Sequence, residues 1–151
     1  MSEIKWISHS EADTVRFGEE FGLKYIRDGA VVCMYGELGA GKTHFIKGIA
    51  GSLGIDEREL TSPTFALAHE FECICKGAPF SLYHLDCYRF AKPEELLQLG
   101  VEDYLYPVHA ATFIEWPERI AGIIPENAIH VRIDVISEHE RVIEVRSKNY
   151  S

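Results

Sequence analysis

A glycine-rich stretch, GELGAGKT from Gly36 to Thr43, holds the residues of this chain best suited to chemistry. It matches the G-x-x-x-x-G-K-T pattern of loops that bind nucleotide phosphates. Glycine permits positive φ angles, so consecutive backbone N–H groups can turn toward a polyphosphate. Lys42 would bridge the β- and γ-phosphates, and the Thr43 hydroxyl would coordinate Mg²⁺. The stretch therefore predicts a nucleotide and magnesium site.

Two carboxylates end hydrophobic runs that we expect to be strands. Asp86 closes FSLYHLD and Glu115 closes ATFIE. In an α/β sheet both would lie at the carboxyl edge, where ligands bind, and a P-loop site needs a carboxylate there to hold the metal. Aspartate is the commoner residue in this role, so Glu115 departs from the majority pattern. Both are candidate metal and catalytic residues, and the division of roles between them stays open.

Other residues near these motifs have candidate roles. Thr64 lies in SPTF, which Pro63 favours as a loop, and NTPases place a γ-phosphate-sensing threonine in such a loop; a plain turn is the alternative. Trp116 either borders the site, anchors a partner or packs in the core. Histidines such as His44 and His84 are given structural or solvated roles, because no nucleophile elbow of the G-x-S-x-G type is present.

The elements around these motifs predict one mixed α/β domain over residues 1–151. AVVCMY (30–35) is an apolar run typical of a buried strand, and helices are expected from Ser10 to about Asp28 and from Gly41 to Leu53. We expect a P-loop NTPase fold with a mixed, mostly parallel central sheet, antiparallel hairpins and flanking helices. The remaining expected elements are the hairpin ALAHEFECIC with APFSLYHLD, the helix PEELLQL, the strand AATFIEW and the hairpin AIHVRIDVI with RVIEVR.

The composition is that of an ordinary soluble domain, with 46% hydrophobic residues and a net charge of −9. An acidic surface repels nucleic-acid backbones, so no stable direct binding of DNA or RNA is expected. Neither an export signal nor a membrane span is expected. The four cysteines are expected to be reduced and structural; a disulfide or metal at Cys73 and Cys75 is the alternative.

The motifs GELGAGKT, SPTF, YHLDCYR, PEELLQLGVEDY and FIEWPER, in this order, are similar to those of the bacterial TsaE (YjeE) family. The resemblance runs from about residue 10 to residue 146, and SPTF, LYHLDCYR and EWPER are more discriminating than the P-loop. It implies a small cytoplasmic ATPase that uses ATP and Mg²⁺. It also implies two partners, TsaB and TsaD, which place a threonylcarbamoyl group on adenosine 37 of tRNA. ATP hydrolysis would reset or activate that complex and would not perform the transfer.

The resemblance also implies roles for single residues. Glu115 would be the second metal-site residue, while Asp86 and Thr64 would support hydrolysis. Ser10 and Arg141 match family positions near the nucleotide. With these two, the expected nucleotide contacts are Glu37, Leu38, Gly39, Ala40, Gly41, Lys42, Thr43 and His44.

Three other functions share part of the pattern. A P-loop small-molecule kinase needs an acceptor pocket and an arginine-bearing lid; Arg89 and Arg119 are available, but the sequence has no arginine-rich insertion. A GTPase needs an N-K-x-D motif, which the sequence lacks. The third function is a binding module that nucleotide switches on and off; a slow ATPase that changes its affinity for a partner would have both functions. Measuring ATP turnover alone, with small acceptors and with the two partner proteins separates these functions.

Overall fold

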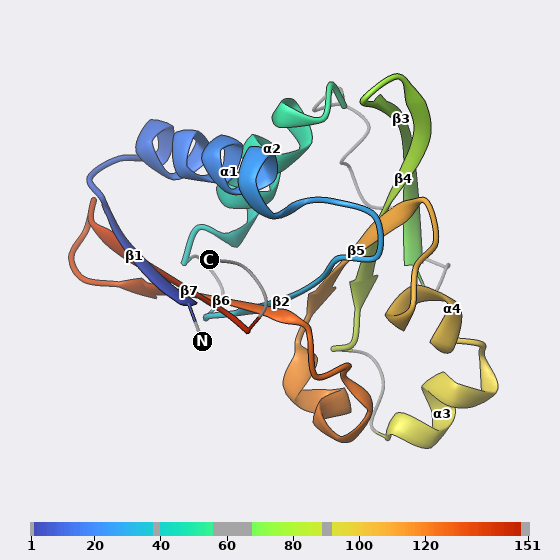
Figure 1. Cartoon of the computed structure of the whole chain (residues 1–151). Helices are drawn as coiled ribbons and strands as arrows, with labels where there is room; N and C mark the ends of the chain where they lie inside the picture. The colour runs from blue at the N-terminus through green and yellow to red at the C-terminus, as the bar shows by residue number, and fades with distance from the viewer. Residues whose placement is uncertain (1, 38–39, 56–67, 89–91, 149–151) are drawn as a thin grey trace.

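The computed structural model describes residues 2–37, 40–55, 68–88 and 92–148, and over these residues it forms one seven-stranded sheet. The strand order is β1-β7-β6-β2-β5-β4-β3 (Figure 1). The strands are β1 (Ser2–Ser8), β2 (Val31–Tyr35), β3 (Ala68–Cys75), β4 (Ala78–Asp86), β5 (Ala110–Glu115), β6 (Ile129–Val135) and β7 (Arg141–Ser147).

The expected mixed α/β fold with two antiparallel hairpins is confirmed. The central strands β6, β2, β5 and β4 are parallel to one another, whereas β1, β7 and β3 join antiparallel. Parallel and antiparallel pairings are thus equal in number, three of each, so the parallel share is smaller than expected. The reason is that the sheet carries an antiparallel extension at both sides of its parallel centre.

The helices divide between the two faces of the sheet. The helical elements are α1 (Glu11–Tyr25), α2 (Lys42–Ser52), α3 (Pro93–Gln98), α4 (Glu102–Leu105) and the 3₁₀ helix η2 (Pro117–Ile123). Helices α1 and α2 lie over one face, and α3, α4 and η2 gather at the other side, near β4 and β5 (Figure 1). The sheet has a hydrophobic core on each face. Alternate residues of β2 point to opposite faces, so Val32 packs in the core under α1 and α2, and Val31 packs in the core with α3, α4 and η2. None of the described helices is long and apolar enough to cross a bilayer.

Local signals in the sequence explain most element boundaries. Ser10 caps α1 as predicted, because its hydroxyl accepts a hydrogen bond of 3.0 Å from the Asp13 backbone N–H. The turn between β3 and β4 falls on Lys76 and Gly77, both with positive φ, as a tight hairpin turn requires. The sequence analysis did not predict β1, α4 or η2, which are a half-exposed edge strand and two short elements.

The cysteines divide into two pairs by burial. Cys33 and Cys87 are buried, and loss of solvation raises the pKa of each thiol to about 12. Both therefore behave as small apolar core residues rather than reactive thiols. Cys73 and Cys75 on β3 are half-buried, and partial burial raises the thiol pKa of Cys73.

Helices α1 and α2 pack unusually closely because glycines face each other between them. A Cβ atom on Gly48 would collide with the Val15 carbonyl oxygen and lie 2.9 Å from the Glu19 backbone nitrogen. A Cβ atom on Gly18 would collide with the Phe45 carbonyl oxygen. Since α2 follows the P-loop directly, this contact fixes the helix that positions the predicted phosphate site.

Replacing Gly48 by alanine is expected to lower the free energy of unfolding by about 1–3 kcal/mol, the usual cost of overpacking against atoms that cannot move aside. Gly51 on the same helix is the matched control, because a Cβ atom there meets nothing within 4 Å. Gly51→Ala should raise stability by about 0.5–1 kcal/mol, the helix preference of alanine. Urea denaturation of the two variants measures both changes, and equal stabilities would contradict the close packing.

Candidate nucleotide-binding site

A cavity of about 520 Å³ opens at the carboxyl ends of the parallel strands β4 and β5, beside the start of α2. The first turn of α1 and the turn between β6 and β7 form its other walls. The structure brings together eight sequence-predicted site residues in its lining: Ser10, Gly41, Lys42, Thr43, His44, Asp86, Glu115 and Arg141. Glu37 and Ala40 are described but do not line it, and Leu38, Gly39 and Thr64 lie outside the described residues.

The ends of the loop have the backbone that its glycines predict. Gly36 has φ 142°, and a Cβ atom there would lie only 2.5 Å from the Ile133 carbonyl oxygen. Gly41 has φ 106° and is the N-cap of α2, with no side chain to satisfy the first N–H groups of the helix. The first N–H groups of an α-helix have no partner within the helix, and together with the helix dipole they favour an anion at this position.

Lys42 is held inside the cavity rather than in solvent. Its side chain is 7% exposed, and its Nζ atom lies 5.1 Å from the centroid of the Trp116 ring. Trp116 has φ 58°, a conformation that bulky residues rarely adopt, and its ring packs on Tyr88 with centroids 5.0 Å apart. The strand end therefore turns sharply to place an aromatic ring against the lysine, in the cation–π arrangement.

Trp116 fluorescence is expected to change on addition of ATP, because a phosphate bound by Lys42 would lie close to the Trp116 ring. The chain has two tryptophans, so Trp6→Phe isolates the Trp116 signal. A Trp116→Phe protein, which keeps only Trp6, is the matched control and should show no change. Flat titrations with ATP in the Trp6→Phe protein would contradict the placement of the ring beside the phosphate site.

The two predicted carboxylates are neighbours across a strand pair. Asp86 and Glu115 are register partners at the ends of β4 and β5. Asp86 is exposed and its Oδ1 accepts a hydrogen bond of 2.9 Å from the Tyr88 backbone N–H. Glu115 is more enclosed, with a side chain 19% exposed, and its Oε2 lies 3.1 Å from Nε2 of His84.

Glu115 is ionised in this environment. Burial opposes its charge, but the hydrogen bond from His84 and the charges of His84 and Lys42 outweigh burial and hold its pKa below the usual value. A negative carboxylate thus faces a positive lysine in the same cavity. This pair of charges suits a site that binds a phosphate and a cation side by side.

The donor set fits Mg²⁺ rather than a metal held by protein alone. Within the described ranges, no group of three His, Cys, Asp or Glu residues is arranged to hold an ion. In nucleotide sites Mg²⁺ takes only one or two carboxylates and completes its shell with phosphates and water. The Thr43 hydroxyl, Asp86 and Glu115 line one cavity and offer such a set.

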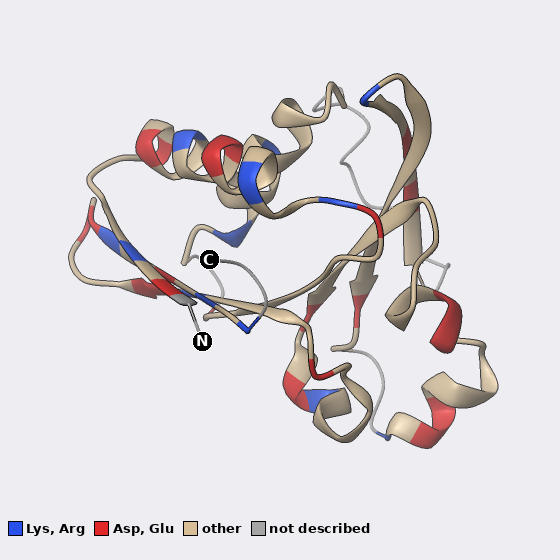
Figure 2. Ribbon diagram, viewed as in Figure 1, with Lys and Arg blue, Asp and Glu red and all other residues tan. Residues whose placement is uncertain are grey.

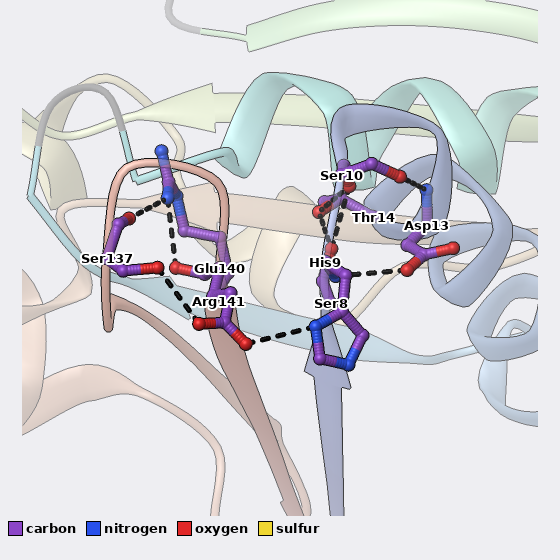
Figure 3. A network of polar contacts seen from close by, with 8 residues as sticks. All are labelled: Ser8, His9, Ser10, Asp13, Thr14, Ser137, Glu140 and Arg141. Carbon is purple, nitrogen blue, oxygen red and sulfur yellow. Dashed lines mark hydrogen bonds and ion pairs between the residues drawn. The ribbon is translucent and has the colours of Figure 1, made fainter.

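Arg141 links the β6–β7 turn to the P-loop by hydrogen bonds. Its Nε donates to the Ala40 carbonyl at 3.1 Å, and its Nη1 donates to the carbonyls of Ser137 and Glu140, each at 2.9 Å. Figure 3 shows this turn facing the start of α1, where His9 Nδ1 lies 3.0 Å from Glu140 Oε2. Arg141 therefore shapes the cavity wall through backbone contacts.

Sequence reasoning missed four polar residues of the lining, namely Glu11, Thr14, Glu138 and His139. Glu11 and Thr14 lie on the first turn of α1, and the other two lie in the β6–β7 turn. Each of the four lies within a few residues of Ser10 or Arg141, and this closeness in sequence could have indicated that they line the same cavity. The Thr14 hydroxyl is itself engaged, 2.7 Å from the Ser8 hydroxyl at the end of β1.

Comparison with known proteins decides the family. The model of the family described as "Threonylcarbamoyl adenosine biosynthesis protein TsaE" matches residues 8–143. The chain belongs to the TsaE family. A tRNA threonylcarbamoyladenosine biosynthesis protein TsaE from Treponema pallidum is 37% identical over 142 residues, 94% of this chain and 99% of the relative. The TsaE of Haemophilus influenzae is 36% identical over 136 residues, 87% of this chain and 82% of the relative.

The fold agrees with this family. The crystal structure of Bacillus subtilis YdiB matches with a TM-score of 0.74 and 27% identity, over 97% of this chain and 86% of that chain. A TsaE of the same organism is 31% identical over 143 residues. The resemblance found in the sequence is thus confirmed, and membership of the TsaE family gives the chain a role in the biosynthesis of threonylcarbamoyladenosine in tRNA.

Proposed function

We propose that this chain is a Mg²⁺-dependent ATPase that sustains threonylcarbamoyladenosine formation at position 37 of tRNA by binding and resetting a TsaB–TsaD complex. The observation that carries the proposal is that the start of α2, Lys42 and Glu115 meet in one cavity. Binding of the phosphates, neutralisation of their charge and a residue that orients the attacking water all promote phosphoryl transfer to water.

Each residue has a distinct task in this mechanism. The N–H groups at the start of α2 and the Lys42 ammonium bind the phosphates and stabilise the charge that develops on them. A Mg²⁺ ion held by the Thr43 hydroxyl and a strand-end carboxylate would neutralise further phosphate charge. The ionised Glu115 either holds that ion through water or accepts the proton of the attacking water.

The alternative of a small-molecule kinase finds little support among the described residues of the cavity lining, which do not include Arg89. Kinases of that kind use lid arginines to neutralise the transferred group. Among the described residues, Arg141 alone contributes a guanidinium to the lining, and it is bonded to backbone carbonyls.

Charge distribution supports a protein partner rather than direct contact with tRNA. The net charge is −9, and Figure 2 shows acidic residues on α1, α3 and α4. A protein that acts on a modifying complex needs no tRNA-binding patch of its own. The partners in this proposal are TsaB and TsaD, and the site of action is the cytoplasm.

Reconstitution tests this function. Purified TsaB, TsaD and an unmodified tRNA, supplied with the activated threonylcarbamoyl donor, should modify tRNA over many turnovers only when this chain and ATP are present. A non-hydrolysable ATP analogue should limit the reaction to about one turnover. Undiminished repeated turnover without the chain would contradict the proposal, and phosphorylation of a small acceptor would favour a kinase.

A further inference from the structure

His84 is the protein partner of the Glu115 carboxylate. The two side chains meet through His84 Nε2 and Glu115 Oε2, 3.1 Å apart, and both are largely enclosed, with exposed fractions of 24% and 19%. A carboxylate can only accept, so Nε2 carries the hydrogen and donates it. Among the described residues, the other oxygen of Glu115 makes no hydrogen bond that would compete with a ligand.

The sheet register explains why these two residues meet. His84 on β4 is the register partner of Phe113 on β5, two residues before Glu115. It also lies two residues before Asp86, so His84, Asp86 and Glu115 share one face of the sheet. Diagonal neighbours of this kind lie within reach of long side chains. Asp86 and Glu115 line the cavity, whereas His84 does not, which places the histidine behind the carboxylate.

We propose that His84 is a positioning residue for hydrolysis, which fixes one oxygen of Glu115 by a hydrogen bond so that the other is presented to the metal and the attacking water. This inference rests on the proposed function, and nothing in the sequence motifs assigned it. His84 touches neither nucleotide nor water in this role. It acts only by restricting the rotation of Glu115, which would otherwise adopt several rotamers in the cavity.

The hydrogen bond that orients such a carboxylate affects both metal affinity and activity. Loss of a group that hydrogen-bonds a metal-site residue typically lowers metal affinity or activity by roughly 10–100-fold. The effect should fall on kcat and on Mg²⁺ affinity, because Glu115 acts at the metal and the water. Nucleotide affinity measured without metal should not change, since the start of α2 and Lys42 are unaltered.

Two substitutions whose side chains are of nearly equal length distinguish the effect of the hydrogen bond from the effect of packing. In His84→Gln the amide nitrogen can take the place of Nε2 and donate to Glu115, while His84→Met fills the space without a donor. We expect His84→Met to lower kcat and the Mn²⁺ affinity of the ADP complex by roughly 10–100-fold, and His84→Gln to restore most of both. Mn²⁺ affinity is read by electron paramagnetic resonance and requires no catalysis.

His69 supplies the matched control. It faces His84 across the β3–β4 pair but makes no hydrogen bond to Glu115. His69→Met should therefore leave kcat and Mn²⁺ affinity within about threefold of the wild type, a change of only some 0.6 kcal/mol. Equal losses in His69→Met and His84→Met would show a general disturbance of the sheet and would overturn the positioning role.

A double substitution tests whether His84 acts through Glu115. In a Glu115→Gln background, His84→Met should lower kcat no further, because the group that it positions has already been removed. Additive losses would overturn the inference. Wild-type levels of kcat and Mn²⁺ affinity in His84→Met would also overturn it while leaving the ATPase proposal standing. Absence of ATP hydrolysis by the wild-type chain, alone and with TsaB and TsaD, would instead refute the proposed function.

Discussion

Lys42→Ala is expected to abolish measurable ATP binding while the protein remains folded. Lys42 is 7% exposed and lines the cavity at the start of α2, where its ammonium would meet the β- and γ-phosphates. Leaving a buried charge without its partner costs about 3–5 kcal/mol, which corresponds to a loss of affinity of roughly 150- to 5,000-fold. Isothermal titration calorimetry with ATP and Mg²⁺ measures this loss.

A second lysine of α2 controls for nonspecific effects of removing charge. Lys47 lies on the same helix but does not line the cavity. Lys47→Ala should therefore keep ATP affinity within a few-fold of the wild type. Circular dichroism melts of both variants establish that each is folded. If folded Lys42→Ala bound ATP as tightly as the wild type, the assignment of the phosphate site would be wrong.

Glu115→Gln is expected to leave ATP binding nearly intact and to slow hydrolysis by about 10²–10⁴-fold, the usual contribution of general acid–base catalysis. Glutamine keeps the length of the side chain and an oxygen that can accept from His84. The substitution removes the negative charge of Glu115, which His84 and Lys42 stabilise and whose pKa they lower. Phosphate release in the presence of TsaB and TsaD measures the rate, and calorimetry measures ATP affinity.

Asp86→Asn in the same assay divides the roles of the two carboxylates. Asp86 is the register partner of Glu115, but it is exposed and is bonded to the Tyr88 backbone. It too should spare ATP binding and lower turnover, and the variant with the larger loss identifies the principal carboxylate. Full turnover in Glu115→Gln would remove that residue from the mechanism.

The parts of the site that the sequence predicts are those determined by local chain geometry. A G-x-x-x-x-G-K-T loop between an apolar run and a helix can fold in few ways, and Gly41 has the left-handed backbone that this requires. The same holds for Asp86 and Glu115, because a carboxylate that closes a buried parallel strand must lie at the carboxyl edge of the sheet.

The parts that sequence reasoning missed depend on contacts between distant segments. The bond from His84 to Glu115 follows from the register of β4 on β5, which no local pattern specifies. The bond from Arg141 to the Ala40 carbonyl joins positions 101 residues apart. Strand β1 was missed although Ile4 and Trp6 alternate with the exposed Glu3 and Lys5, because it forms only by pairing with β7 at the other end of the chain.

A crystal structure with Mg²⁺ and a non-hydrolysable ATP analogue tests the central claim most directly. The account predicts the triphosphate at the start of α2, with Lys42 moved from the Trp116 ring onto the β- and γ-phosphates. It also predicts Thr43 and one strand-end carboxylate around the ion. A triphosphate bound elsewhere on the chain, or a cavity left empty at saturating analogue, would contradict it.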